Sequence, residues 1–199
     1  FGAAEDFLSL ADNIAGTAVP VDLVAANGGV SAAICSVGLD SEVAYSIPKY
    51  RRLPLCGGQM AYNISIVERL LQPMGHRLRI TVDDDVLEGD YLYGMVSNTT
   101  SVGRFRNFPP GNPDLSDGLL EVTLISPIRD VKDMEEFSRA LLMTDPSILN
   151  SMMTTFSTAK VKITAAAELL WTLDGEAGGA HQTVEIEAIP HAYTIIHGK

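Results

Sequence analysis

The stretch that decides the fold is residues 20–37, PVDLVAANGGVSAAICSV. Two runs of β-prone, mostly apolar residues flank Asn27-Gly28-Gly29. Asn-Gly between two such runs is the strongest short-range signal for a β-hairpin, because both residues tolerate the positive φ angles of a tight turn. We therefore predict an antiparallel pair of strands here.

Short strands and a few helices recur around this hairpin. Alternating or apolar runs predict strands at 76–83, 86–97, 119–125, 159–164, 168–173, 183–189 and 193–196. Apolar residues at helical spacing predict helices at 4–15, 59–72, 135–142 and 148–153, the third of them capped by Asp130. The chain lacks the long crossovers that parallel strands need. The expected fold is mainly β: a two-layer antiparallel β-sandwich with a few peripheral α-helices, formed by residues 1–199 as a single domain.

Composition excludes several classes of function. The 199 residues include 14 basic and 25 acidic side chains, which gives a formal net charge of −11. Such a chain repels polyphosphate, so we expect no nucleic-acid partner. No run approaches the roughly 20 apolar residues that span a bilayer, and no signal peptide is visible. Cys35 and Cys56 form neither a metal motif nor a disulfide framework, which favours a reducing, cytoplasmic compartment.

The standard signatures of enzymes are absent from the sequence. It has no phosphate-binding P-loop, no dinucleotide-binding glycine motif and no zinc-protease motif. The 29–33 stretch resembles half of a nucleophile elbow, but it lies in a predicted hairpin rather than on a strand-to-helix turn. The irregular segment 99–114 is rich in Pro, Gly and Asn, and loops of this length are usually functional or mobile.

Four acidic residues are the best candidates for chemistry. Asp117-Gly118 precedes a predicted strand, Asp174-Gly175-Glu176 follows one, and Asp22 lies in an otherwise apolar run. An Asp-Gly pair by itself indicates a turn. Two carboxylates that flank one glycine can in addition shift each other's pKa, which gives Asp174 and Glu176 a second interpretation.

Taken in order, these motifs resemble the soluble diacylglycerol kinase and sphingosine kinase family of lipid kinases. The likeness is to the C-terminal β-sandwich domain of that family and covers nearly the whole chain. It rests on Gly16–Leu23, on Ser36–Val43 (similar to G-x-D-A-x-V), on Asn112–Val122 (P-x-A-x-x-D-G-x-L-x-V) and on 173–176 (D-G-E). The family's G-G-D-G-T and G-T-x-N-D-F motifs are missing, so we expect a nucleotide-binding α/β domain to precede Phe1 in the full protein.

The resemblance implies a role for each candidate. Asp174 would be the general base that takes the proton from a lipid hydroxyl, with Glu176 beside it in the cleft. Asp22 would belong to a carboxylate network that steadies the nucleotide phosphates through water and Mg²⁺. The substrate would be a diacylglycerol-like or sphingoid alcohol, and ATP would be the co-substrate.

The resemblance also implies a structural divalent cation, Mg²⁺ or Ca²⁺. Asp117 would bind it together with the main-chain carbonyls of Asp114 and Leu119, a set of oxygen ligands that suits a hard ion. ATP would reach the site through the missing domain, contact with a membrane would be peripheral, and a homodimer remains open. We expect the chain alone to be inactive, because phosphoryl transfer needs amides or cations around the γ-phosphate.

Two other classes of function stay open. A non-catalytic β-sandwich that binds a lipid or a protein partner predicts an apolar groove and no dependence on Asp174. A glycosidase could use Asp174 and Glu176 as its carboxylate pair, although one Trp in the chain is thin support for a carbohydrate site. The basic cluster of Lys49, Arg51 and Arg52 is typical of a solvated loop that could meet an anionic surface.

Overall fold

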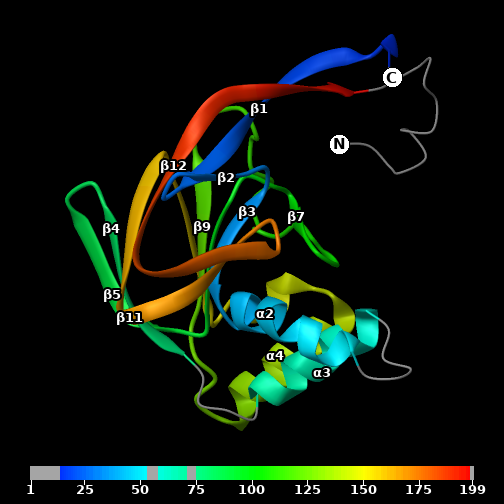
Figure 1. The fold of residues 1–199 in the computed structure, drawn as a ribbon, viewed down its shortest axis with the longest axis vertical. Helices are drawn as coiled ribbons and strands as arrows, with labels where there is room; N and C mark the ends of the chain where they lie inside the picture. Colours follow the sequence, from blue (N-terminus) through cyan, green and yellow to red (C-terminus); the bar gives the residue numbers. More distant parts are fainter. Residues whose placement is uncertain (1–13, 53–57, 71–74, 198–199) are drawn as a thin grey trace.

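A computed structural model describes residues 14–52, 58–70 and 75–197. Within these residues one antiparallel sheet of ten strands dominates, and β7 and β8 form a separate two-stranded sheet (Figure 1). The predicted helix at 4–15, apart from its last two residues, and Cys56 lie outside the described residues.

The strands are β1 (Thr17–Ala26), β2 (Gly29–Ser31), β3 (Ile34–Gly38), β4 (His76–Val82), β5 (Asp85–Tyr91), β6 (Tyr93–Ser97), β7 (Ser101–Val102), β8 (Phe105–Arg106), β9 (Leu120–Ile125), β10 (Met153–Thr158), β11 (Lys160–Leu173) and β12 (Glu176–His197). The helices are α2 (Leu39–Arg51), α3 (Gly58–Leu70), α4 (Val131–Met143) and the short 3-10 helix η2 (Pro146–Leu149).

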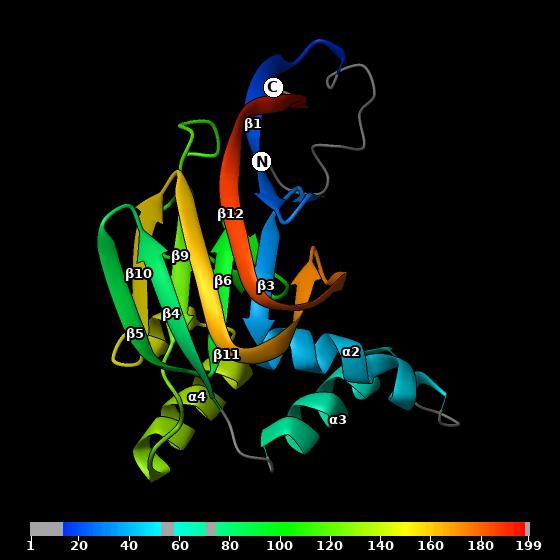
Figure 2. The same ribbon diagram turned by 60° about the vertical axis from the view of Figure 1, so that its left-hand side comes forward.

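The ten strands make two layers because β11 belongs to both. Its residues 162–165 pair with β4, whereas its residues 171–173 pair with β3. Between these stretches its register against β12 shifts. The sheet, in the order β10-β9-β6-β3-β11-β12-β1-β2, therefore folds so that β4 and β5 lie over β9 and β10 (Figure 2). The two-layer antiparallel β-sandwich with peripheral helices is confirmed.

The main core lies between these layers. Its members come from both layers, including Ile80 of β4, Ile163 of β11 and Leu124 of β9, each almost completely buried. A second apolar cluster lies where α4 and η2 cover β6 and β9, with Met95, Ile125 and Phe137 among its members. Burial of apolar surface on both sides of one sheet is what stabilises the strands that carry the polar site.

The hairpin predicted at Asn27-Gly28 is present. These two residues have φ of 45° and 84°, as a two-residue turn between right-twisted strands requires. The second run of the hairpin is not one strand, however. It divides at Ala32–Ala33 into β2, which pairs with β1, and β3, which pairs with β6 and β11.

Other elements differ from the sequence-based expectation. The helix α2 was not predicted; it contains Pro48 and has only a weakly apolar face, although acidic residues lie in its first turn and basic residues in its last. The expected strand 86–97 divides at Leu92, where the chain passes between layers and Leu92 N–H donates to Ile125 O. The strand β10 was also missed, and the four last predicted strands merge into β11 and β12. The helix capped by Asp130 is confirmed.

Candidate functional site

The Asp174-Gly175 pair forms the turn between β11 and β12. Both residues have positive φ, 51° and 80°, and Leu173 pairs with Glu176 across the turn. Asp174 N–H donates to Ile34 O at 2.8 Å. The turn is therefore held against the start of β3, a segment 140 residues away in sequence.

The Asp174 carboxylate is bound by the break between β2 and β3. Ser31 Oγ donates to Oδ1 at 2.6 Å, and Ala32 N–H donates to Oδ2 at 2.7 Å. The N–H groups of Ala33 and Ile34 both donate to Oδ1 at 3.0 Å. Burial acts to raise the pKa of Asp174, but the hydrogen bonds from Ser31 and the three amides outweigh it and hold the pKa below its ordinary value.

Glu176 differs from its neighbour. It is the first residue of β12 and is exposed. Among the described residues, none forms a hydrogen bond or an ion pair with its carboxylate. The sequence predicted two carboxylates on either side of Gly175. In the structure they differ, because hydrogen bonds fix the Asp174 carboxylate whereas the Glu176 carboxylate is exposed and available to another group.

A line of polar side chains runs inward from this turn and was missed by the sequence analysis. Ser36 Oγ lies 2.7 Å from Thr172 Oγ1 and donates to Asp40 Oδ2 at 2.6 Å. Thr172 precedes Asp174 by two residues. Burial raises the pKa of Asp40, and the Ser36 hydrogen bond lowers it in part. The available signal was a polar residue between apolar ones: Ser36 between Cys35 and Val37, and Thr172 between Trp171 and Leu173.

Asp22 is completely buried, and main-chain groups bind both of its carboxylate oxygens. Gly118 N–H donates to Oδ2 and His191 N–H to Oδ1, each at 2.7 Å. Its own N–H donates to Leu115 O at 2.9 Å. Asp22 thus connects β12 to the loop before β9, and its expected part in a network toward nucleotide phosphates stays a prediction.

Asp22 and Asp174 belong to one region of the molecule. Val24 of β1 pairs with Ser31 of β2, and Ser31 donates to Asp174. Asp22 precedes Val24 by two residues on the same strand. The hairpin at Asn27-Gly28 therefore carries one aspartate and holds the other.

The loop predicted to bind a structural cation is compact. Asp117 Oδ1 accepts from Leu119 N–H at 2.9 Å, and Asp114 Oδ1 accepts from the N–H and the hydroxyl of Ser116. These contacts are local turns of the kind that Asp commonly forms. The described part of the chain holds no group of three His, Cys, Asp or Glu residues placed to bind a metal. The predicted ligands, one carboxylate and main-chain carbonyls, stay a prediction.

A buried carboxylate next to this loop supports the fit of a cation. Glu121 of β9 is 6% exposed, and its Oε2 atom is buried without a hydrogen-bond partner. Burial, followed by the negative charge of Asp117, raises the pKa of Glu121 to about 7; a hydrogen bond from Ser157 opposes this shift. An unpartnered carboxylate oxygen near a second carboxylate is an arrangement that a divalent cation would stabilise.

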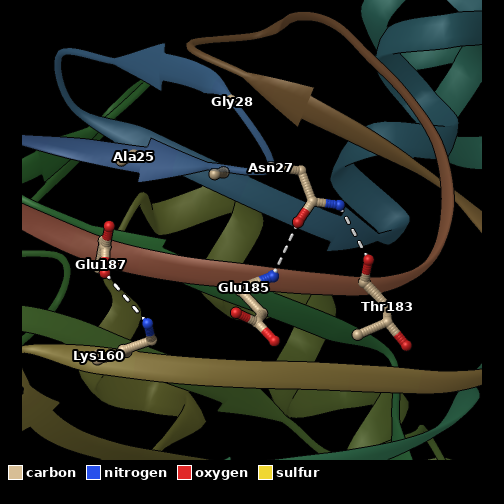
Figure 3. A pocket seen from close by; sticks show the side chains of 8 residues that line it. Ala25, Asn27, Gly28, Lys160, Thr183, Glu185 and Glu187 are labelled. Carbon is tan, nitrogen blue, oxygen red and sulfur yellow. Dashed lines mark hydrogen bonds and ion pairs between the residues drawn. The ribbon is translucent and has the colours of Figure 1, made fainter.

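None of these carboxylates lines the pocket between β1, β11 and β12. It has a volume of about 340 Å³ and opens on the outer side of β1, β11 and β12 (Figure 3). Its polar groups bind one another: Asn27 spans Thr183 O and Glu185 N, and Lys160 pairs with Glu187 at 3.2 Å. With its polar groups already paired, this pocket is a weak candidate for a ligand site.

The basic cluster of α2 is partly paired. Lys49 forms an ion pair with Glu68 of α3 at 2.7 Å, whereas Arg51 and Arg52 are exposed. None of the helices in the described residues has both the length and the apolar character needed to cross a bilayer.

Comparison with known proteins finds a diacylglycerol kinase among the relatives of this chain. The curated diacylglycerol kinase of Bacillus subtilis (strain 168) is 28% identical over 178 residues, which cover 88% of this chain. This chain matches 56% of that relative's length. Its activity, substrates and partners therefore stay proposals for the present chain.

Solved structures share the fold. A diacylglycerol kinase from Bacillus anthracis str. Sterne aligns with a TM-score of 0.58 at 16% identity, over 92% of this chain and 55% of that one. Another structure from the same organism, whose kinase assignment is provisional, aligns with a TM-score of 0.67 at 21% identity, over 92% and 57%. Residues 33–197 match the model of the YegS C-terminal NAD kinase beta sandwich-like domain. The chain belongs to this family of β-sandwich domains.

Proposed function

We propose that this chain is the lipid-substrate half of an ATP-dependent lipid kinase, which transfers the γ-phosphate of ATP to a diacylglycerol-like or sphingoid alcohol. The observation that carries the proposal is the Asp174-Gly175-Glu176 turn, held by four donors at the β2–β3 break, in a chain similar to a diacylglycerol kinase. The nucleotide domain precedes this chain in the full protein, and the chain by itself is inactive.

In the reaction, the lipid hydroxyl oxygen attacks the γ-phosphorus, ADP leaves, and the hydroxyl proton passes to a carboxylate. In this proposal Asp174 orients the hydroxyl and accepts this proton. Its lowered pKa makes it a weak base. A weak base is sufficient where the transition state is loose and positioning supplies most of the catalysis. Glu176 adds a second, uncommitted charge at the same turn.

The remaining assignments extend the same proposal. Mg²⁺ bound with ATP would neutralise charge on the phosphates, and Asp22 would take part in that network through water. A structural Mg²⁺ or Ca²⁺ is held by Asp117 with the carbonyls of Asp114 and Leu119. The full protein works in the cytoplasm and meets the membrane peripherally, where its lipid substrate resides.

The test is turnover of the intact protein with ATP, Mg²⁺ and either diacylglycerol or a sphingoid alcohol. Asp174→Asn is expected to lower kcat by about 10²–10⁴-fold, the usual cost of losing a general base. Glu176→Gln is expected to lower kcat less and to leave the melting temperature unchanged, because its carboxylate forms no hydrogen bond or ion pair with the residues that the structure describes. Glu185→Gln, on the exposed outer surface beside Lys162, is the matched control.

Near wild-type turnover of a folded Asp174→Asn variant would remove its assigned role. An intact protein that binds lipid vesicles but transfers no phosphate to either alcohol would instead favour the non-catalytic β-sandwich. Because Asn places an NH₂ group where Asp174 Oδ2 accepts from Ala32, the melting temperature of the variant must be measured alongside.

A further inference from the structure

Among the described residues, three buried oxygen atoms lack a hydrogen-bond partner, and they belong to residues at or next to the paired ends of β6 and β9. They are Ser97 Oγ, Asn98 Oδ1 and Glu121 Oε2. The residues are 0%, 3% and 6% exposed. Buried polar groups are almost always bound, so each exception needs an explanation such as a water molecule or an ion.

Ser97 and Glu121 lie opposite each other on the adjacent strands β6 and β9. Ser97 of β6 pairs directly with Glu121 of β9, and directly paired residues of antiparallel strands project from the same face of the sheet. Met95 projects from this face too, as every second residue of a strand does, and it packs in one cluster with Phe108 of the segment 99–118. That segment therefore helps to cover the face on which the two oxygens lie.

Asn98 links the same place to the loop of Asp117. Its Nδ2 donates to Asp22 O at 2.8 Å and to Leu115 O at 3.1 Å, and these bonds fix its side chain. Leu115 precedes Asp117 by two residues. Asp22 also accepts from the N–H of Gly118, the residue after Asp117, so Asn98 and this loop meet at Asp22.

We propose that Glu121 is a further carboxylate ligand of the divalent cation at Asp117, and that Ser97 Oγ supplies a neutral oxygen to the same site. The inference rests on the cation site of the preceding proposal and is independent of the kinase reaction. It adds buried residues of β9 and β6 to a set that was confined to residues 114–119.

The chemistry of the unpartnered atoms favours a cation over an anion. All three are oxygens that accept, and none belongs to a basic side chain. Hard divalent cations take carboxylate, carbonyl and hydroxyl oxygens. The charge of such an ion would offset the repulsion between Asp117 and Glu121 and the cost of burying Glu121. A ligand on β9 would also bind the loop to the central sheet.

Calorimetric titration of the intact protein, freed of metal, with Ca²⁺ or Mg²⁺ tests this assignment. The wild-type protein is expected to bind one ion at this site with a rise in melting temperature. Asp117→Asn is expected to abolish that binding. Glu121→Gln, which keeps the shape of the side chain, is expected to weaken it by about 10–100-fold. Glu185→Gln, an exposed carboxylate on β12, is expected to bind as the wild type does.

The outcomes separate the two proposals. Cation affinity unchanged in Glu121→Gln but lost in Asp117→Asn overturns the inference and leaves the loop site intact. Absence of binding to the wild-type protein overturns both cation assignments and leaves the kinase proposal untouched.

Discussion

Asp174 and Glu121 are two carboxylates with different surroundings and opposite pKa shifts. Asp174 lies in an exposed turn, yet a side-chain hydroxyl and three amides hold its pKa low. Glu121 lies inside the sheet, has one oxygen without a partner, and has its pKa raised to about 7. The number of hydrogen-bond donors that reach a carboxylate, and not its burial alone, therefore decides whether its charged form is favoured.

Asp22 is buried more deeply than either of these carboxylates, and two main-chain amides bind its oxygens. Asp22→Ala is expected to destabilise the fold by about 2–5 kcal/mol, since the N–H groups of Gly118 and His191 lose their acceptor in the interior. Urea unfolding at pH 7 measures the change. The exposed Glu187→Ala is the control, and an equally small loss for Asp22→Ala would show that the amides find other partners.

Glu121 is expected to cost stability when it is ionised. Because its pKa in the folded state lies above the unfolded value of about 4.5, its contribution is fully present below pH 4.5 and is lost as pH rises through about 7. Glu121→Gln removes this dependence. In metal-free buffer it is expected to be more stable than the wild type by about 1–2 kcal/mol at pH 8, with little difference near pH 5.

Thermal unfolding at the two pH values measures that difference. An equal gain at both would assign the effect of Glu121→Gln to packing rather than to charge.

Substitution of Ser31 tests how far the donors around Asp174 lower its pKa. Ser31→Ala removes one donor from Asp174 Oδ1 and is expected to raise the pKa of Asp174, at a cost of about 1 kcal/mol. The folded pKa of Asp174 is lowered, so its stabilisation is present above the ordinary value and lost as pH falls through the folded pKa. In the variant this stabilisation is smaller, and its loss is complete at a higher pH. A carbon-13 NMR titration of the carboxyl group reads the shift directly, and no shift would mean that the amides alone set the pKa.

Much of the fold could be predicted because it depends on local chemistry. Asn27-Gly28 fixes a hairpin turn through its backbone conformation, and Asp130 fixes the start of α4 through its side chain. The helix α2 escaped prediction because Pro48 interrupts its pattern. The length of β11 and β12 escaped prediction for a different reason: whether a strand ends or bends into another layer depends on its partners, which lie far away in the chain.

The candidate site likewise has features that depend on local sequence and features that depend on distant segments. The sequence alone determined that Asp174 and Glu176 flank one glycine in a turn, because Asp-Gly geometry is local. Only the tertiary structure decided that Ser31 and three amides bind Asp174, that Asp22 is enclosed, and that one oxygen of Glu121 has no hydrogen-bond partner among the described residues. The physical reason is that burial and hydrogen bonding depend on segments far apart in sequence, and these set the charge state of a carboxylate whatever its neighbours in the chain.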